Sequence, residues 1–486
     1  MAAKPNMQYT TRMTARQNGG AVVPVPFDPN ELWGLKRQHP ITGTINGMGI
    51  RGTVMPEASG WAFTIGAAWL RPVLPEGIPA MDRRDETQTR RTNTTNHRSC
   101  QAARKRHQTT TNAMTTPLPT APDRRLAVAR WRLHNQHLAG RAATDPTAVI
   151  RRLLAVQAEN HSQASWAIAS RCQAPDASLF QRLYDEGAIL RTHVLRPTWH
   201  FVLPDDIGWL LDLTRPRVVR GWERQLEQEG VTRSIWERAA TAISTVLSGR
   251  HLTRAELGDH LATEGFVFDG HALMLVTGLS EVHGLICSGP TREDQHTYAL
   301  FTDRVRYTRH LDAAAARTEL VARYVAGHGP VTDRDLAYWA SMPLGEVRAG
   351  LADNNERFDT FDLDGSTFWH SNEPPNGETI EPRAHLLQIL DEYYRGYQHT
   401  RNLLDIAGFK VHAGRESAIG MLIVDSQIAG DMKRTVDADK VTFDLRLLRS
   451  LTNDESDAVH TAALRYGNYL QRPAIVKVTI APSTTA

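Results

Sequence analysis

Downstream of Arg125, long stretches carry apolar residues at helical spacing, and short segments of alternating apolar and polar residues lie between them. One order appears three times: a helix, a short turn, a second helix with an N-cap, and then two strands. A helix-turn-helix followed by a β-hairpin is the winged form of a DNA-reading motif. The pattern therefore predicts three winged-helix units in series, at 124–230, 231–310 and 311–375.

The first unit opens with a clear helix signal, because Asp145 is a favourable N-cap and Pro146 a favourable first-turn residue. The amphipathic segment that follows predicts a helix from Thr147 to Val156. Two further helices and a strand pair that turns at Arg196-Pro197 are expected next, over Gln163–Arg171, Ser178–Glu186 and Ile189–Leu203.

The second and third units each contain the spacing of a capping box, Thr253 with Glu256 and Thr332 with Asp335. The third unit should end in a hairpin that turns near Asp364-Gly365. The remaining helices and the second wing are expected at Ser234–Gly249, Gly270–Ile286, Cys287–Phe301, Ala316–His328 and Leu344–Ala352.

Both ends of the chain are predicted to be rich in strands. Residues 376–486 alternate short strands with one helix, Ser456–Leu470, which predicts a C-terminal β-rich, barrel-like domain and an α+β chain as a whole. Residues 19–77 predict a small and possibly incomplete β domain, with a hairpin signal at Asn46-Gly47. The basic, Thr-rich segment 78–123 has too few apolar residues to offset its ordering entropy, so we expect a disordered linker.

Composition narrows the class of protein. The chain is 41% hydrophobic and 22% charged with a net charge of +3, which suits a soluble protein with a polyanionic partner and equally one without. Cys100, Cys172 and Cys287 are too far apart for a disulfide framework or a cysteine zinc site. No stretch approaches about 18 consecutive apolar residues, so we expect no membrane span. The cysteines fit a reducing compartment and the polar N-terminal residues do not form a secretory signal, so we expect a cytoplasmic protein. We also expect a monomer.

Three strings of the chain are LLAVQAENHSQASWAIASR, RTHVLRPTWHFV and HLLQILDEYYRGYQ. They resemble the AlkZ-like alkylpurine and crosslink DNA glycosylases, a tandem winged-helix family, and the resemblance covers residues 126–486. It implies three winged helices and a β-barrel around double-stranded DNA. It also implies a monofunctional enzyme that removes N-alkylated purines, in some members from interstrand crosslinks, with no metal and no other cofactor. The N-terminal block resembles a small bacterial β-barrel domain of uncharacterised function as far as Leu70-Arg71.

The family's catalytic motif, Gln–aliphatic–Gln or Gln–aliphatic–Asp, maps onto Gln157-Ala158-Glu159, where Glu159 departs from both forms. An N7-alkylated purine is cationic, so it is a good leaving group and the enzyme need not protonate it. What remains is to hold a water, which a glutamine can do, and to accept its proton, which a carboxylate can do. In extended backbone, residues two apart point the same way. The preceding helix should therefore end near Gln157, with Ala158 facing inward. Taken alone, two polar residues at a helix end are more often solvated caps.

Candidate DNA contacts come from arginines near the motif. Arg196 and His200 are an even number of residues apart in the predicted strand pair, so they could lie on one face of it and contact phosphate or sugar. A structural role for His200, with its hydrogen bonds made inside the protein, fits the sequence equally well. Arg217 and Arg220 share a helix face, which suits either phosphates or solvent. Arg292 lies at the tip of the second wing. His193 and His200 do not have the spacing of a metal site.

Two other functions remain open at this stage. One is a non-catalytic winged-helix DNA-binding or regulatory protein, and the other is an accessory protein that protects a host from its own genotoxin. Position 159 separates enzyme from regulator, because a carboxylate or amide there can handle a water.

Overall fold

The computed structural model of the 486-residue chain describes residues 14–15, 21–33, 38–45, 48–57, 60–65, 121–375, 380–388, 390–409 and 420–480. The chain forms two compact units, Met1–Met114 and Thr115–Ala486. The expected linker lies outside the described residues up to residue 120. Its last three residues do not belong to a linker, because α3 (Ala121–Asn135) begins there.

Where the structure describes it, the N-terminal unit forms a five-stranded sheet of order β1-β2-β5-β4-β3, with the short helix α1 between β2 and β3. Val23, Val54 and Phe63 fill its small core. Strands β3 and β4 pair through Ile45 and Met48, which confirms the two arms of the predicted hairpin, whereas its turn residues Asn46-Gly47 lie outside the described residues. The elements are β1 (Thr14–Ala15), β2 (Ala21–Val25), α1 (Pro29–Trp33), β3 (His39–Ile45), β4 (Met48–Glu57) and β5 (Gly60–Ile65).

The larger unit begins with helices around a small sheet of order β6-β8-β7. Asp145 caps α4 (Pro146–Leu153) as predicted, but this helix ends at Leu153 and not at Val156. Leu154 takes a φ of 69°, which is incompatible with a continuing helix, and the chain then extends into β6 (Val156–Gln157). The following elements are α5 (His161–Ala169), α6 (Ala177–Asp185), β7 (Leu190–His193), β8 (Trp199–Val202) and α7 (Pro204–Gln228).

The next segment has its own apolar core and a three-stranded sheet of order β10-β11-β9. Thr253 and Glu256 form the predicted capping box. The third helix stops at Val282 because Gly284 takes a φ of 70°, and Ile286 belongs to a strand instead. The elements are α8 (Arg233–Leu247), β9 (Leu252–Thr253), α9 (Arg254–Thr263), α10 (Gly270–Val282), β10 (Ile286–Ser288), β11 (Thr297–Leu300) and α11 (Phe301–Arg304).

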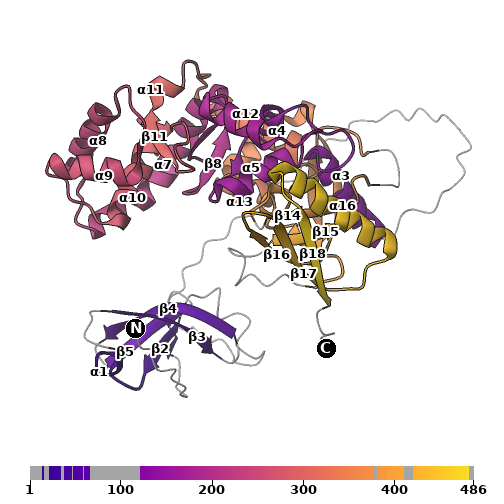
Figure 1. The fold of residues 1–486 in the computed structure, drawn as a ribbon, viewed down its shortest axis with the longest axis horizontal. Coiled ribbons are helices and arrows are strands. Elements are labelled where there is room, and N and C mark those ends of the chain that lie inside the picture. Colours follow the sequence, from indigo (N-terminus) through magenta and orange to yellow (C-terminus); the bar gives the residue numbers. More distant parts are fainter. Residues whose placement is uncertain are drawn as a thin grey trace, which may run out of the picture. The chain divides into compact units, whose positions relative to one another are not determined.

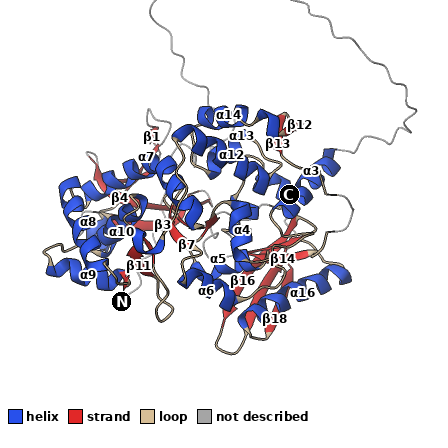
Figure 2. Ribbon diagram, turned by 90° about the horizontal axis from the view of Figure 1, so that it is seen from above, coloured by secondary structure: helices blue, strands red, loops and turns tan. Residues whose placement is uncertain are grey.

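A third helical group follows, and Figure 2 shows its helices α12, α13 and α14 gathered together. Thr332 and Asp335 form the second predicted capping box. The hairpin turns at Asp364 and Gly365, both with positive φ, as the sequence indicated. The elements are α12 (Ala313–His328), α13 (Asp333–Trp339), α14 (Leu344–Ala352), η1 (Asn355–Arg357), β12 (Asp359–Leu363) and β13 (Ser366–His370).

The C-terminal part is a five-stranded sheet of order β14-β15-β16-β17-β18, with α16 lying against it (Figure 1). Strand β18 runs parallel to β17 because α16 crosses over between them. The elements are β14 (Ala384–Leu387), α15 (Glu392–Arg395), η2 (Arg401–Leu404), β15 (Gly420–Val424), β16 (Gln427–Val436), β17 (Val441–Leu447), α16 (Asn453–Leu470) and β18 (Ala474–Ile480). Helices and sheets are thus mixed along the chain, as expected, and no described helix is both long and apolar enough to cross a membrane.

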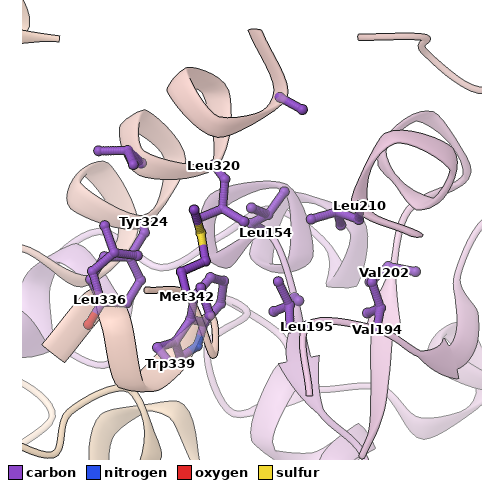
Figure 3. Close-up of a cluster of buried hydrophobic side chains, with 14 of the residues drawn as sticks. Leu154, Val194, Leu195, Val202, Leu210, Leu320, Tyr324, Leu336, Trp339 and Met342 are labelled. Atoms are coloured by element: carbon purple, nitrogen blue, oxygen red, sulfur yellow. The ribbon is translucent and has the colours of Figure 1, made fainter. Parts of the chain in front are cut away.

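One apolar core joins the first helical group, residues 121–228, to the third, residues 313–370. Leu154 and Leu195 come from the first group, and Leu320, Trp339 and Met342 come from the third; all belong to this core (Figure 3). Leu195, like Leu154, has a positive φ, of 65°. Each of these leucines stands shortly before a candidate site residue, Gln157 or Arg196, so the core fixes the backbone that carries them.

Candidate active site

Gln157 is held from two sides. It lies in β6, where it pairs with His200 of β8, and the residue is only 7% exposed. Its Oε1 accepts a hydrogen bond from Nη2 of Arg196 at 3.1 Å. Its backbone N–H donates to Oε1 of Glu392, also at 3.1 Å. The side-chain amide therefore has a fixed direction, with its Nε2 donor directed away from the bond to Arg196.

Glu159 lies two residues further on and is exposed. Its Oε1 accepts the backbone N–H of Trp199 at 2.9 Å, which ties it to the same hairpin. The guanidinium of Arg191 donates to the carbonyl oxygens of Ala158 and Glu159, at 2.9 and 3.1 Å. Ala158 itself is fully buried, as expected. Strand β6 ends at Gln157 and Glu159 lies in the bend that follows, so the amide is buried and the carboxylate faces solvent.

Arg196 and His200 contact each other, as their spacing indicated. Nδ1 of His200 donates to the carbonyl oxygen of Thr198, so its Nε2 is free to accept from Nη2 of Arg196 at 3.3 Å. Burial and the charge of Arg196 lower the pKa of His200 to about 3, which keeps the ring neutral. His200 is 0% exposed, so in this structure it holds Arg196 and does not reach the surface. Arg196 is partly exposed and bridges the ring to Gln157.

Glu392, at the start of α15, is a buried carboxylate that the sequence analysis did not single out. Besides the N–H of Gln157, it accepts hydrogen bonds from Nε2 of His328 at 3.1 Å and Nε1 of Trp339 at 2.8 Å. Burial alone would raise its pKa, but His328, the charge of Arg196 and the bond from Trp339 bring the pKa down to about 2. An ionised carboxylate thus sits directly behind Gln157.

A second buried carboxylate, Glu281 of α10, supports the hairpin from the other side. It lies 2.5 Å from Nδ1 of His193 and accepts from Nε1 of Trp199 at 3.1 Å. The guanidinium of Arg191 stacks 3.9 Å from the Trp199 ring. Trp199 is partly exposed and links Glu281 to Glu159, because its indole N–H donates to the first carboxylate and its backbone N–H to the second.

The family described as DNA glycosylase AlkZ-like matches residues 150–469. The chain belongs to the AlkZ-like DNA glycosylase family. The Interstrand DNA cross-link repair glycosylase of Streptomyces sahachiroi is 26% identical to this glycosylase over 253 residues, 49% of this chain and 67% of that protein. The solved structure of Streptomyces sahachiroi DNA glycosylase AlkZ has the same fold, with a TM-score of 0.59 at 19% identity, over 73% of this chain and 99% of that one.

The other predicted DNA contacts of the glycosylase are spread along the fold. Arg217 is partly buried on α7, 3.5 Å from the carboxylate of Glu346 on α14. Arg220, one turn further on, is exposed. Arg292 pairs with Glu256, the last residue of the capping box that opens α9. The structure therefore brings Arg196 to Gln157 but leaves Arg217, Arg220 and Arg292 away from that contact network.

Proposed function

We propose that this glycosylase hydrolyses the N-glycosidic bond of N-alkylated purines in double-stranded DNA, including purines joined in interstrand crosslinks. The printed name of the Streptomyces relative, a cross-link repair glycosylase, supports the lesion class. Membership of the family favours an enzyme over the non-catalytic DNA-binding or regulatory protein that the sequence left open.

The chemistry asked of the protein is modest, because an N7-alkylated purine leaves as a neutral base. The sugar becomes oxocarbenium-like, so the enzyme must place a water and put negative potential beside the sugar. Gln157 holds the water through its Nε2 donor, since its Oε1 is engaged by Arg196. Glu159 accepts the proton of that water and stabilises the sugar cation.

One observation carries this assignment: Gln157 is fixed at both its amide oxygen and its backbone N–H, while Glu159 presents a carboxylate to solvent two residues later. Solvated helix caps would not need a buried ionised carboxylate and an arginine to hold them. Among the described residues, Glu159 Oε2 has no hydrogen-bond partner, which suits a group that takes up a proton from water.

The DNA-binding scaffold is part of the same proposal. The three helix-and-hairpin groups act as tandem winged helices, at 124–230, 231–310 and 311–375, and residues 376–486 act as a barrel-like domain that completes the surface. Arg196, Arg217, Arg220 and Arg292 contact phosphates, and His200 supports Arg196. The enzyme acts as a monomer on DNA in the cytoplasm and uses no cofactor.

Base release from a duplex that carries N7-methylguanine, measured under single-turnover conditions, tests the catalytic assignment. Glu159→Ala should slow release by about 10²-fold or more, the range for a positioned acid or base, and should leave DNA affinity almost unchanged. Glu159→Gln should retain more activity than Glu159→Ala, because an amide still holds water. Gln157→Ala should slow release while it spares binding.

Equal rates for Glu159→Ala and the parent would disprove the role of Glu159. If the parent releases no base from any alkylated duplex, including a crosslinked one, the proposed substrate class is wrong.

A further inference from the structure

Two arginines from distant segments converge on the aromatic ring of Tyr338, at the end of α13. The guanidinium carbons of Arg196 and Arg401 each lie 5.8 Å from the centre of that ring. A third arginine, Arg395, lies 5.8 Å from the neighbouring ring of Tyr394, and Arg401 lies 4.3 Å from that same ring. Since Arg196 also binds Gln157, this group of charges begins at the candidate active site.

Both converging arginines are fixed before any ligand binds. Arg196 is held by Gln157 and His200, and Nε of Arg401 donates to the backbone carbonyl oxygens of Tyr394 and Tyr397, at 3.2 and 2.9 Å. Backbone carbonyls hold a guanidinium in place without neutralising its charge. Neither Arg196 nor Arg401 forms an ion pair with a carboxylate among the described residues.

Tyr338 reports the excess of positive charge around it. Its ring is partly exposed, and burial by itself would raise the pKa of its hydroxyl. The charges of Arg401, Arg196 and Arg395 nevertheless lower that pKa overall. Glu392 is the carboxylate that acts on Arg196, but its oxygens already accept hydrogen bonds from the backbone of Gln157, from His328 and from Trp339.

A purely structural role explains this arrangement poorly. A guanidinium beside an aromatic ring contributes about 0.5–1 kcal/mol at exposed sites, and like charges gathered at one ring oppose that gain. Positive charge is also unfavourable next to a sugar that becomes cationic during base release. A bound anion removes both difficulties, and DNA supplies phosphates on each side of every sugar.

We propose that Arg196, Arg401 and Tyr338 bind a phosphate of the DNA backbone next to the nucleotide whose base is removed, with Arg395 adding charge at the edge of this site. The phosphate fixes the register of the sugar against Gln157 and Glu159, and it neutralises the arginines, so that the potential at the sugar is set by the carboxylates. This proposal rests on the proposed function, because it takes the damaged strand as the ligand.

The test combines a variant with a chemically altered phosphate. Duplexes with one N7-methylguanine carry a single uncharged methylphosphonate at each phosphate around the lesion in turn, and both affinity and single-turnover release are measured at constant ionic strength. For the parent enzyme, one position next to the lesion should weaken binding by about 10-fold, as expected for loss of a charged hydrogen bond. Arg401→Gln should bind unmodified DNA about as weakly as the parent binds the duplex with the neutral phosphate. Neutralising that phosphate should weaken the affinity of the variant almost no further.

Arg238→Gln is the matched control, because Arg238 is an exposed arginine that also lies over an aromatic ring, 5.3 Å from the centre of Phe266, and that ring packs against a separate core. This variant should keep the parent's sensitivity to the methylphosphonate. Tyr338→Phe should lose part of that sensitivity and provides the same comparison if Arg401→Gln does not fold by its thermal melting curve.

Full methylphosphonate sensitivity in both Arg401→Gln and Tyr338→Phe would overturn the proposal, as would a parent enzyme that is insensitive at every position. DNA affinity tests the phosphate site independently of base release, which tests the proposed function. A parent that binds in a phosphate-dependent manner but releases no base would refute the proposed chemistry and leave the phosphate site supported.

Discussion

Glu392 is ionised although it has no contact with solvent, and this combination has a measurable consequence. Its pKa of about 2 lies below the ordinary value of 4.5. The folded state therefore binds a proton less readily than the unfolded chain. The resulting stabilisation is complete above about pH 4.5 and is lost as the pH falls toward 2.

Glu392→Gln should destabilise the enzyme by roughly 2–3 kcal/mol at pH 7, because an amide nitrogen cannot accept a hydrogen bond: at one position it would meet the N–H of Gln157, and at the other the N–H groups of Trp339 and His328. Between pH 4.5 and 2 the free energy of unfolding of the variant should also fall less than that of the parent, because residue 392 no longer takes up a proton. Denaturant unfolding at several pH values measures both effects. Glu346→Gln is the control, since its half-exposed carboxylate faces Arg217 at 3.5 Å and should change stability by less than about 1 kcal/mol. Equal effects of the two substitutions would show that Glu392 is not a stabilising ion.

At the scale of elements, two short backbone segments carry the site, and each begins at a leucine with positive φ. Leu154 ends α4 and leads into β6, while Leu195 turns the chain between β7 and β8. A positive φ in a residue with a Cβ costs about 1–3 kcal/mol. Both side chains are fully buried in the core shown in Figure 3, and that burial compensates for the strained backbone.

Leu195→Ala should therefore destabilise the enzyme by about 2–5 kcal/mol, as large-to-small substitutions in a packed core do. Alanine keeps the Cβ, so the backbone strain remains and the change reports lost packing. Base release should slow as well, because Arg196 follows directly. Leu464→Ala on α16 removes a leucine that is 56% exposed and should have little effect on unfolding. The melting temperatures of both variants measure this difference. A Leu195→Ala variant as stable as the parent would contradict the predicted loss of packing.

At the scale of the whole molecule, the family match lies entirely within the second compact unit. It covers residues 150–469 of the unit Thr115–Ala486, and the N-terminal unit has a separate small core. The β block is therefore not expected to contribute to the fold of the glycosylase.

A chain that begins at Met114 should bind alkylated DNA and release base as the full chain does. Its melting temperature should stay within about 5 °C of the transition of the larger unit in the full chain. Calorimetry and a binding titration on the two chains provide the measurement. A loss of more than about tenfold in affinity would assign the N-terminal unit a part in DNA binding.

Short-range signals were enough to predict most elements. The capping boxes at Thr253 and Thr332 and the turn at Asp364-Gly365 formed where the sequence placed them, because the atoms involved lie within a few residues of one another. The end of α4 was predicted too late. Nothing local marks Leu154 as a helix breaker, and its conformation is maintained by packing against residues far along the chain, such as Leu320.

By itself, the sequence determined the order of helices and strands, the family and the candidate pair Gln157 and Glu159. Only the tertiary structure decided what surrounds that pair. Glu392 is 235 residues from Gln157 along the chain, and Arg401 converges with Arg196 only because α13 and the segment after α15 lie beside the hairpin. Periodicity reports which face of an element is apolar, whereas the partner of a buried charge depends on how distant elements pack, and that information is not local.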